Sequence, residues 1–545
     1  MTLSLKKNVI AEPSIAGWYA WSYLLPPQTL ALYLKNHYRT IAESFIANPQ
    51  THRTALKQAR FQGGPFVIER HEGAHEAVKQ WYEATAQQRA PLLELADAIE
   101  ELEQKILPEQ TGASMEAVYK QLPEPLAGCV ELFYNRDNRT PDYRFIEPLL
   151  YSSPYFDRGL HQVRFSEVHA DDRDFALTTP VLEYSPEQVL VTVPLDSALL
   201  DDVFRGGLGA DDLDRVTAEL GLRGERAEVF KGFFEEDTVE TGATVETGAT
   251  GATGAAPPGG GDVIEYVGHA CVFVRHRGTT FLVDPVISYS GYSREADGRF
   301  TFADLPERVD YVMITHNHQD HMLLETLLKI RHRVGTVLIA KSSGSSLVDP
   351  NLKRVLHALG FADVVELDDM DSVRTPGGTV TALPFLGEHG DIRIRTKCGW
   401  LLDLDGKRVL FAADSTNVSP ELYPRVAALV DHVDTVFIGM ESVGAPVSWL
   451  YGPLFPERLD RKVDAGRRLK GSNFEQGAAI VDALGADSVY VYAMGQEPWL
   501  GAVMCVEYDE AHPAMVDSDK LVAYVRDSGR TAKRLYLHET IALGT

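Results

Sequence analysis

The densest group of metal-binding side chains in this sequence lies in a single loop. Residues 316–321 read His-Asn-His-Gln-Asp-His, between an apolar strand-like run and a helix-like run. His316 and His318 can point the same way from the end of the strand. Asp320 and His321 would then stand at the start of the helix and face a second point. Two metal ions about 3.5–4 Å apart share ligands in such a layout, so the loop predicts a two-metal site.

The chain beyond residue 261 has the strands and helices needed to position this loop. Short apolar stretches alternate with helical periodicity. Many strands with interspersed helices suit an α/β fold of the four-layer αββα type, whose site-bearing loops gather at one edge of two sheets. We expect strands at 263–267, 271–274, 280–283, 311–314, 336–340, 400–404, 409–411, 435–438 and 488–493, and helices at 323–334, 351–359 and 473–484.

A run of small residues divides the chain. Residues 238–261 form a degenerate Thr/Gly/Ala repeat, which predicts a flexible linker between an N-terminal domain at 1–237 and a C-terminal domain at 262–545. The N-terminal domain mixes helical periodicity with strand-like runs, as in an α+β fold. It has no nucleotide-binding or nucleophile motif. We therefore expect it to serve dimerisation, partner docking or covering of the site.

Bulk composition limits the functional classes. The 545 residues are 44% hydrophobic, and 52 basic against 78 acidic residues give a net charge of −26. So acidic a surface disfavours nucleic acid and anionic lipid. The four cysteines form no Cys-x-x-Cys motif, the first residues lack a signal-peptide core, and no apolar run approaches the roughly 18 residues of a membrane span. We expect a cytoplasmic protein that binds neither membrane nor nucleic acid.

The segment at about 262–500 resembles the metallo-β-lactamase fold. Its runs Tyr266–Cys271 and Leu282–Pro285 are similar to the first strands of that superfamily. Asp284 would then orient the histidine loop, because metal ligands usually need such partners. A plain turn at the strand end is the alternative for this residue. His269 fits a turn or an orienting role better than the role of a ligand.

Two later loops supply the remaining candidate ligands of such a site. Glu388 and His389 are adjacent where hydrolases of the superfamily usually place a histidine, and Asp414 follows a strand where the superfamily keeps its bridging carboxylate. If Glu388 binds, the site holds three imidazoles and three carboxylates. His316, His318 and Glu388 would then form a two-histidine, one-carboxylate set, which suits non-haem iron with positions open for oxygen.

The final histidine ligand of the hydrolases is missing from this chain. The strand expected at 488–493 runs into a loop without histidine, where Gln496, Glu497 and Trp499 are open to roles in orienting ligands, lining a pocket or packing. The distant His538 is an alternative ligand, but a structural role is the expectation for it. The site therefore departs from the hydrolase pattern in two places.

Both departures together give the chain a resemblance to the diiron β-hydroxylases of nonribosomal peptide synthetase pathways, of the type known from the chloramphenicol pathway. The motifs at 315–321, 387–389 and 413–415 carry this resemblance, which extends over both domains but not over the linker. The resemblance implies one iron ion held by His316, His318 and Glu388, a second held by Asp320 and His321, and a bridge between the two from Asp414.

The same resemblance implies the reaction and the partners. Such a monooxygenase hydroxylates the β-carbon of an amino acid held as a thioester on a carrier domain, and it consumes O2 and two electrons from an external reductase. It also implies a homodimer through the N-terminal domain. Glu388 and Glu441 are the candidate catalytic side chains, although Glu441 could equally be structural. The basic run Arg461–Lys470 is the candidate docking surface for an acidic carrier, with a solvated helix face as the plainer alternative.

Two other functional classes compete with this interpretation. A dizinc hydrolase, such as a lactonase or thioesterase, would use a metal-bound hydroxide and would bind its metal through His389 rather than Glu388. It would be colourless and would need no oxygen. A docking protein with a vestigial site is the second competitor, and the intact set of six candidate ligands argues against it.

Overall fold

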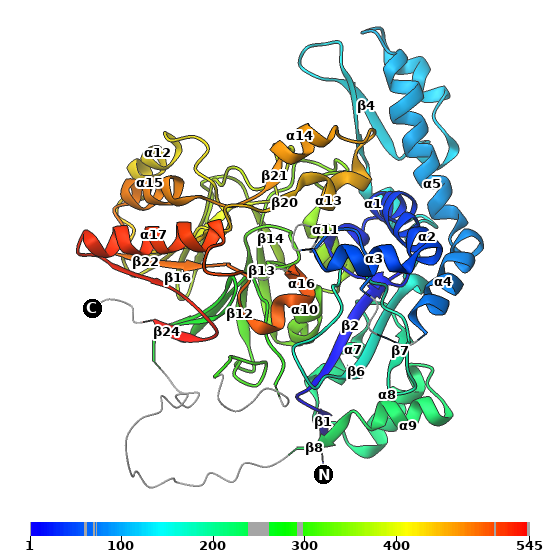
Figure 1. Cartoon of the computed structure of the whole chain (residues 1–545), viewed down its shortest axis with the longest axis horizontal. Helices are drawn as coiled ribbons and strands as arrows, with labels where there is room; N and C mark the ends of the chain where they lie inside the picture. The colour runs from blue at the N-terminus through cyan, green and yellow to red at the C-terminus, as the bar shows by residue number, and fades with distance from the viewer. Residues whose placement is uncertain are drawn as a thin grey trace.

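The computed structural model describes residues 2–58, 61, 63–68, 71, 73–237, 261–290, 298–505 and 508–541. They form an N-terminal part, which ends with β8 (Phe234–Glu236), and a C-terminal part, which begins with β9 (Val263–Gly268). The linker expected at 238–261 lies outside the described residues except for Gly261. Figure 1 shows the two parts side by side, the first in blue to teal and the second in green to red.

The first sheet of the C-terminal part leads into the histidine loop. Strands β11 to β14 run parallel, so their carboxyl ends meet at one edge of the sheet. β11 continues into Asp284 at this edge, and β12 continues into His316. The strand order is β14-β13-β12-β11-β10-β9-β24, with β10 (Cys271–His276), β11 (Thr279–Val283), β12 (Val309–Ile314), β13 (Val334–Ala340), β14 (Val364–Leu367) and β24 (Glu539–Ile541).

The second sheet leads into the two later loops. β16 and β18 both pair antiparallel with β17, so the loops that follow them leave at the same edge. The loop after β16 contains Glu388 and His389, and the loop after β18 contains Asp414. The order is β15-β16-β17-β18-β19-β22-β23, with β15 (Ser372–Thr375), β16 (Gly378–Leu383), β17 (Gly399–Leu404), β18 (Lys407–Phe411), β19 (Thr435–Gly439), β22 (Ser488–Tyr492) and β23 (Thr531–Arg534).

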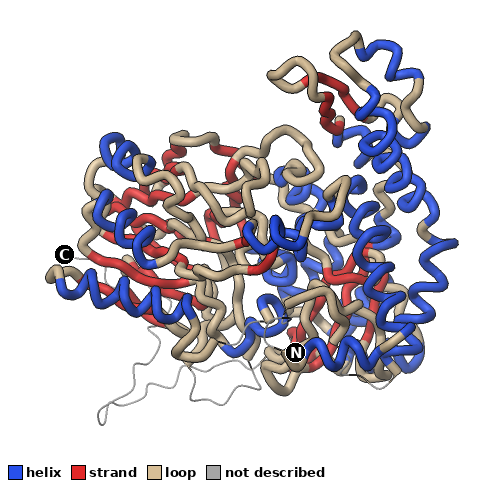
Figure 2. Tube along the Cα trace, turned by 45° about the horizontal axis from the view of Figure 1, so that its top comes forward, coloured by secondary structure: helices blue, strands red, loops and turns tan. Residues whose placement is uncertain are grey.

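Apolar side chains hold the two sheets face to face and attach a helical layer to each. Val272 and Phe281 from the first sheet share one buried cluster with Trp400 and Phe411 from the second. Figure 2 shows the strands as red layers with helices outside them. The predicted αββα sandwich is therefore confirmed. The second sheet is covered by α12 (Leu422–Val430), α15 (Phe474–Leu484) and α17 (Pro513–Asp527), and α10 (Leu324–Ile330) and α11 (Leu352–Ala358) pack against the first.

The N-terminal part is an α+β unit, as predicted. Its sheet has the order β3-β2-β6-β7, with β2 (Val9–Ile15), β3 (Trp18–Tyr19), β6 (His161–Glu167) and β7 (Val189–Thr192). β1 (Leu3–Leu5) pairs with β8, and β4 (Val130–Tyr134) pairs with β5 (Pro141–Phe145). The helices are α1 (Pro27–Tyr33), α2 (Arg39–Ala47), α3 (Pro49–Leu56), α4 (Ala74–Gln88), α5 (Ala90–Glu101), α6 (Glu147–Tyr151), α7 (Ala198–Arg205), α8 (Ala210–Glu219) and α9 (Gly224–Lys231).

The two parts share a core, and the N-terminal part lies against the histidine loop. Trp21 and Tyr33 belong to the same buried cluster as Leu327 and Tyr451. The Ser22 hydroxyl donates a hydrogen bond to the carbonyl oxygen of Asn317 at 2.9 Å, inside the loop itself. The two parts are therefore not independent domains, because apolar side chains from both parts pack in one shared core.

A short insertion after β19 packs over the same edge of the sandwich. It contains β20 (Ala445–Pro446), α13 (Val447–Tyr451), α14 (Arg461–Gly466) and β21 (Arg468–Leu469), and β20 pairs with β21. A further short helix, α16 (Gly501–Met504), follows β22. The sequence predicted none of these elements, because each is too short to show a helical or strand period.

The start of the helix after the histidine loop differs from the expectation. α10 begins at Leu324, so Asp320 and His321 precede the helix and do not stand on its first turn. The N–H groups of His321 and Met322 both donate to the carbonyl oxygen of His318, at 3.1 and 2.8 Å. These bonds close a tight turn ahead of the helix. Asp320 and His321 are therefore positioned by this turn and by side-chain hydrogen bonds.

Candidate metal centre

Asp284 anchors the histidine loop to the first sheet. Its buried carboxylate accepts hydrogen bonds from the Thr315 N–H at 2.7 Å, from the Thr315 hydroxyl at 2.6 Å and from His321 Nδ1–H at 2.8 Å. The Thr315 hydroxyl gives its proton to Asp284, so it can accept a hydrogen bond from His316 Nδ1–H at 3.1 Å. This network fixes both imidazoles with Nδ1 protonated and Nε2 bare. Asp284 therefore has the orienting contacts that its place after a strand predicted.

The bare nitrogens of His316 and His321 converge on Asp414. Asp414 Oδ2 is 3.1 Å from His321 Nε2 and 4.0 Å from His316 Nε2. Asp320 Oδ2 is 3.7 Å from the same nitrogen of His321. Asp414 thus lies between the two histidines, in a position from which one carboxylate can reach two cations.

His318 faces the other carboxylate of the group. Its Nδ1 is 2.7 Å from Glu388 Oε1, and its Nε2 is 2.8 Å from the hydroxyl of Tyr451 on α13. With Nδ1 turned toward Glu388, the Nε2–H can donate to the Tyr451 oxygen and hold the ring in place. Sequence reasoning missed Tyr451, because this residue lies in an ordinary apolar run far beyond the loop.

Glu388 and His389 both lie in the site but face it differently. His389 Nδ1 is 2.5 Å from Glu388 Oε2, and the His389 ring packs on His318 with ring centroids 4.6 Å apart. Glu388 forms a triplet with His316 and His318 whose ligand atoms all lie within 4.8 Å of one another. Among the described residues, no such triplet includes His389. The geometry therefore favours Glu388 as the ligand and His389 as its neighbour.

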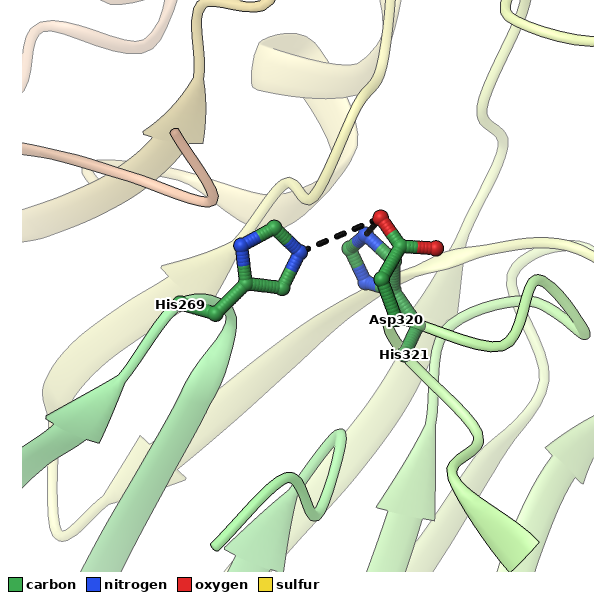
Figure 3. Close-up of side chains that lie close together, drawn as sticks. All are labelled: His269, Asp320 and His321. Atoms are coloured by element: carbon green, nitrogen blue, oxygen red, sulfur yellow. Dashed lines mark hydrogen bonds and ion pairs between the residues drawn. The ribbon is translucent and has the colours of Figure 1, made fainter. Parts of the chain in front are cut away.

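His269 orients Asp320 from the turn between β9 and β10. The Gly495 N–H donates to His269 Nδ1 at 3.2 Å, so the proton of this imidazole is on Nε2 and can be donated to Asp320 Oδ2, also at 3.2 Å. Figure 3 shows the ring directed at this carboxylate, beside His321. His269, Asp320 and His321 are close enough together to hold an ion. We nevertheless assign His269 as a hydrogen-bond donor, because its lone pair faces Gly495.

The donor set fits two cations. His316, His318 and Glu388 make one triplet, and Asp320 and His321 belong to another that shares none of these residues. Asp414 forms a triplet with His316 and His321, so it lies between the two groups. His316 Nε2 and Asp414 Oδ1 are buried without any hydrogen-bond partner. Leaving such atoms unpaired costs free energy that a bound cation would recover. Two imidazoles and one carboxylate suit non-haem iron, and the residues present therefore fit the expected iron pair.

The charges of the site shift the pKa values of its ligand side chains in different directions. Burial, together with the nearby His321, holds the pKa of His316 well below its usual value. Burial opposes ionisation of Glu388, but His318 and His389 outweigh it and hold the pKa of Glu388 well below its usual value. At His321, Asp414, Asp320 and Asp284 outweigh burial and raise the pKa. Glu388 is therefore ready to bind a cation as a carboxylate, whereas His321 must release a proton when a cation binds.

Glu441 lies beside this cluster, partly buried. Burial, followed by the negative charge of Asp414, raises its pKa to about 7. The Tyr508 hydroxyl lies 3.4 Å from Glu441 Oε1, at the outer limit of a hydrogen bond. In addition, the Gly471 N–H donates to the Glu441 carbonyl at 2.7 Å. The negative charge of the candidate ligand Asp414 therefore reaches Glu441.

The loop that lacks the final histidine has a packing role. Glu497 is buried and accepts a hydrogen bond from the Tyr266 hydroxyl. The Arg299 guanidinium lies over the Trp499 ring, with its Cζ atom 4.9 Å from the centre of that ring. His538 Nε2 is 3.6 Å from Glu265, and the His538 ring packs on Phe300. Within the described part of the chain, neither the loop nor His538 belongs to a metal-binding triplet.

The fold and the site together define an enzyme of the metallo-β-lactamase superfamily with a dinuclear metal centre. Residues 4–238 match the family model of the diiron non-heme beta-hydroxylase N-terminal domain, and residues 279–488 match the beta-lactamase superfamily domain. The N-terminal match is the more specific of the two, because many hydrolases share the second domain.

Full-length relatives define the family. The chain is 58% identical over 544 residues to the 4-amino-L-phenylalanyl-[CmlP-peptidyl-carrier-protein] 3-hydroxylase of Streptomyces venezuelae, with 100% of both chains covered. It is also similar to the crystal structure of CmlA, a diiron β-hydroxylase from Streptomyces venezuelae, with a TM-score of 0.92, 57% identity and 99% of each chain covered. A mutant of CmlA gives a TM-score of 0.90 at 56% identity, again over 99% of each chain. The chain belongs to the diiron non-haem β-hydroxylase family.

This membership decides between the classes that the sequence left open. The resemblance to diiron β-hydroxylases is confirmed. The class of protein is therefore an oxidoreductase, and neither a dizinc hydrolase nor a docking protein. Two iron ions are the metals that the family implies.

Proposed function

We propose that this protein hydroxylates the β-carbon of an aromatic amino acid, of the 4-amino-L-phenylalanyl kind, while a carrier domain holds that amino acid as a thioester. The observation that carries the proposal is 58% identity along the entire chain to an enzyme named for this reaction. The substrates of the reaction would be the aminoacyl carrier and O2, and an external reductase would supply two electrons. The place of such a reaction is in antibiotic biosynthesis.

In this proposal the six residues singled out from the sequence hold the iron pair. His316, His318 and Glu388 would bind one ion, Asp320 and His321 the other, and Asp414 would bridge them. The converging ligand atoms of these residues, and the unpartnered His316 Nε2 and Asp414 Oδ1, support the assignment. Bound iron would supply the oxygen chemistry, for which no other described group of this chain is suited.

The protein's own contribution is to fix the ligands and exclude water. Asp284 and His269 hold His321 and Asp320 by hydrogen bonds, and Tyr451 holds His318. The N-terminal part covers the loop through Ser22, and a closed, dry site protects an oxidising centre from side reactions. Glu441, with its raised pKa, would face the substrate pocket beside Asp414.

The same proposal assigns a role to each part of the chain. The N-terminal domain at 1–237 would cover the site, dock partners and form a homodimer, the segment at 238–261 would be a flexible linker, and 262–545 would be the catalytic domain. The family models, at 4–238 and 279–488, support these boundaries. None of the helices in the described ranges has the length and apolar composition to cross a bilayer. The cytoplasm would be the place of action.

The test is a single assay on the iron-loaded full-length protein. A carrier domain loaded with 4-amino-L-phenylalanine is incubated with the protein, O2 and a chemical reductant, and the intact carrier is weighed by mass spectrometry. We expect a gain equal to one oxygen atom on the aminoacyl group, lost when O2 or reductant is omitted. Release of the amino acid without added oxygen would instead identify a thioesterase and overturn the proposal.

A further inference from the structure

Unpaired positive charge is concentrated on one small surface of this acidic protein. Residues 457–470 contain six cations against three carboxylates, in a chain whose net charge is −26. Within the parts of the chain that the structure describes, four exposed cations of this segment form no ion pair. They are Arg458, Arg461, Lys462 and Lys470. These four residues are called the α14 patch below. Figure 1 shows α14 on the outer rim, with β20, β21 and α13 beside it.

An apolar side chain lies among these charges. Val463, in the middle of α14, is 47% exposed, although a valine is usually buried. Asp460 caps the helix and Asp464 accepts hydrogen bonds from Ser448, and neither forms an ion pair with a cation of the patch in the described residues. A valine framed by free cations suits a folded acidic partner, which supplies both carboxylates and an apolar contact.

The α14 patch is attached directly to the loops of the metal centre. Arg467 donates to the carbonyl oxygen of Gly390 at 2.7 Å, two residues beyond Glu388. The carbonyl oxygen of Lys470 accepts a hydrogen bond from Thr416 at 2.9 Å, two residues beyond Asp414. On its other side, α14 is tied to α13, the helix that carries Tyr451. A partner seated on the patch is therefore beside the loops that hold the proposed iron ligands.

We infer that the α14 patch is the docking surface for the acidic carrier domain that delivers the aminoacyl thioester; this inference rests on the proposed function. A long, flexible prosthetic arm needs its carrier to bind near the site, and the patch satisfies that requirement. The negative charge of the rest of the protein repels an acidic partner elsewhere, which directs the carrier to this surface. An acidic electron-donor protein would meet the same charges, so the test separates the two partners.

The experiment reverses two charges of the patch. In the variant Arg461→Glu with Lys462→Glu, both side chains are exposed and make no described side-chain contact, so folding and iron content should be unchanged. We expect the dissociation constant for the aminoacyl carrier to rise about tenfold or more, with a weaker salt dependence than in the wild type. The matched control is Arg425→Glu with Lys520→Glu, which makes the same charge change on α12 and α17 and should leave the dissociation constant within about twofold of the wild type.

A second substrate separates this inference from the proposed function. The same amino acid is offered as a thioester of free pantetheine, which needs no docking, and its hydroxylation is measured with a chemical reductant. The inference holds if the patch variant hydroxylates the pantetheine thioester like the wild type but loses the carrier-bound substrate. It fails if the variant binds the carrier as the wild type does, or if only reduction by a protein donor slows. If the wild type hydroxylates neither substrate, the proposed function itself is wrong.

Discussion

At the scale of single residues, the second nitrogen of each histidine decides how that histidine can bind a metal. Asp284 and Thr315 engage Nδ1 of His321 and His316, which leaves both Nε2 atoms bare. Tyr451 engages the opposite nitrogen of His318, so this ring presents Nδ1 instead. The motif His-x-His-x-Asp-His could not predict which nitrogen each ring presents. The hydrogen-bond partner of each ring either comes from another part of the fold or is brought into place by the conformation of the loop.

Replacing each of two adjacent residues tests which one binds iron. Glu388→Ala should lose iron and abolish hydroxylation, because it removes a carboxylate of the two-histidine triplet. His389→Ala removes only a neighbour of that carboxylate, so it should retain iron and lose about tenfold in activity. Iron per chain is measured by elemental analysis, alongside turnover.

The reverse order of iron contents would contradict the ligand assignment. Far-ultraviolet circular dichroism of both variants, at matched temperature, serves as the control for folding. Both side chains are buried, so a loss of structure in either variant would otherwise imitate a loss of metal.

At the scale of secondary structure, the edge where the strands end determines the site. β11 and β12 deliver Asp284 and the histidine loop, and β16 and β18 deliver Glu388 and Asp414, all at one edge. Short α13 closes this edge from the side. Its end is held to the N-terminal part by the Tyr33 hydroxyl, which donates to the carbonyl oxygen of Leu450 at 2.5 Å.

The role of α13 is tested by removing one hydroxyl. Tyr451→Phe retains the buried ring but deletes the oxygen that lies 2.8 Å from His318 Nε2. We expect the affinity for the iron ion that His318 would hold to fall about tenfold, because removing the hydrogen-bond partner of a metal ligand typically weakens metal binding by about that much. Chelator competition, read from the ultraviolet–visible spectrum of the iron-loaded protein, measures this affinity. Tyr33→Phe is the matched control, since its hydroxyl bonds a backbone carbonyl; an equal loss in both variants would assign Tyr451 to packing alone.

At the scale of the whole molecule, a buried carboxyl group joins the two parts. Glu147, on α6 of the N-terminal part, is fully buried and accepts hydrogen bonds from the Asn351 N–H at the start of α11, at 3.1 and 3.3 Å. Burial raises the pKa of Glu147 to about 7, from an ordinary value of 4.5. Folding therefore favours the protonated form. The resulting penalty is absent below about pH 4.5 and complete above about pH 7.

This linkage predicts a stabilising substitution. Glu147→Gln retains an acceptor for the Asn351 N–H but cannot ionise, so the free energy of unfolding at pH 8 should increase by up to about 3 kcal/mol. At pH 4.5 the gain should shrink to about 0.4 kcal/mol, because the folded state then binds the proton and the unfolded state is half protonated. Urea unfolding at the two pH values measures the difference, and Glu116→Gln, an exposed change, is the control. A gain of equal size at both pH values would contradict the account.

The elements that the sequence did not reveal share a physical cause. β2 is buried along its whole length, yet it contains Glu12 and Pro13, and the Glu12 carboxylate is paired with Arg164 of β6 at 2.6 Å. A strand that hides an ion pair shows no alternation of apolar and polar residues. β15 is an edge strand with half-exposed polar residues, and it shows no apolar run. Periodicity therefore missed both strands.

The sequence by itself determined the fold class, the family and the two-metal character of the site, because ligand types and spacings within one loop are local properties of the chain. Only the tertiary structure decided which nitrogen each histidine presents, that His269 donates to Asp320 and that Tyr451 contacts His318. It also decided that Ser22 of the N-terminal part reaches the loop. The physical reason is that hydrogen bonds depend on atoms brought together by packing, and more than 100 residues separate several of these partners in the chain.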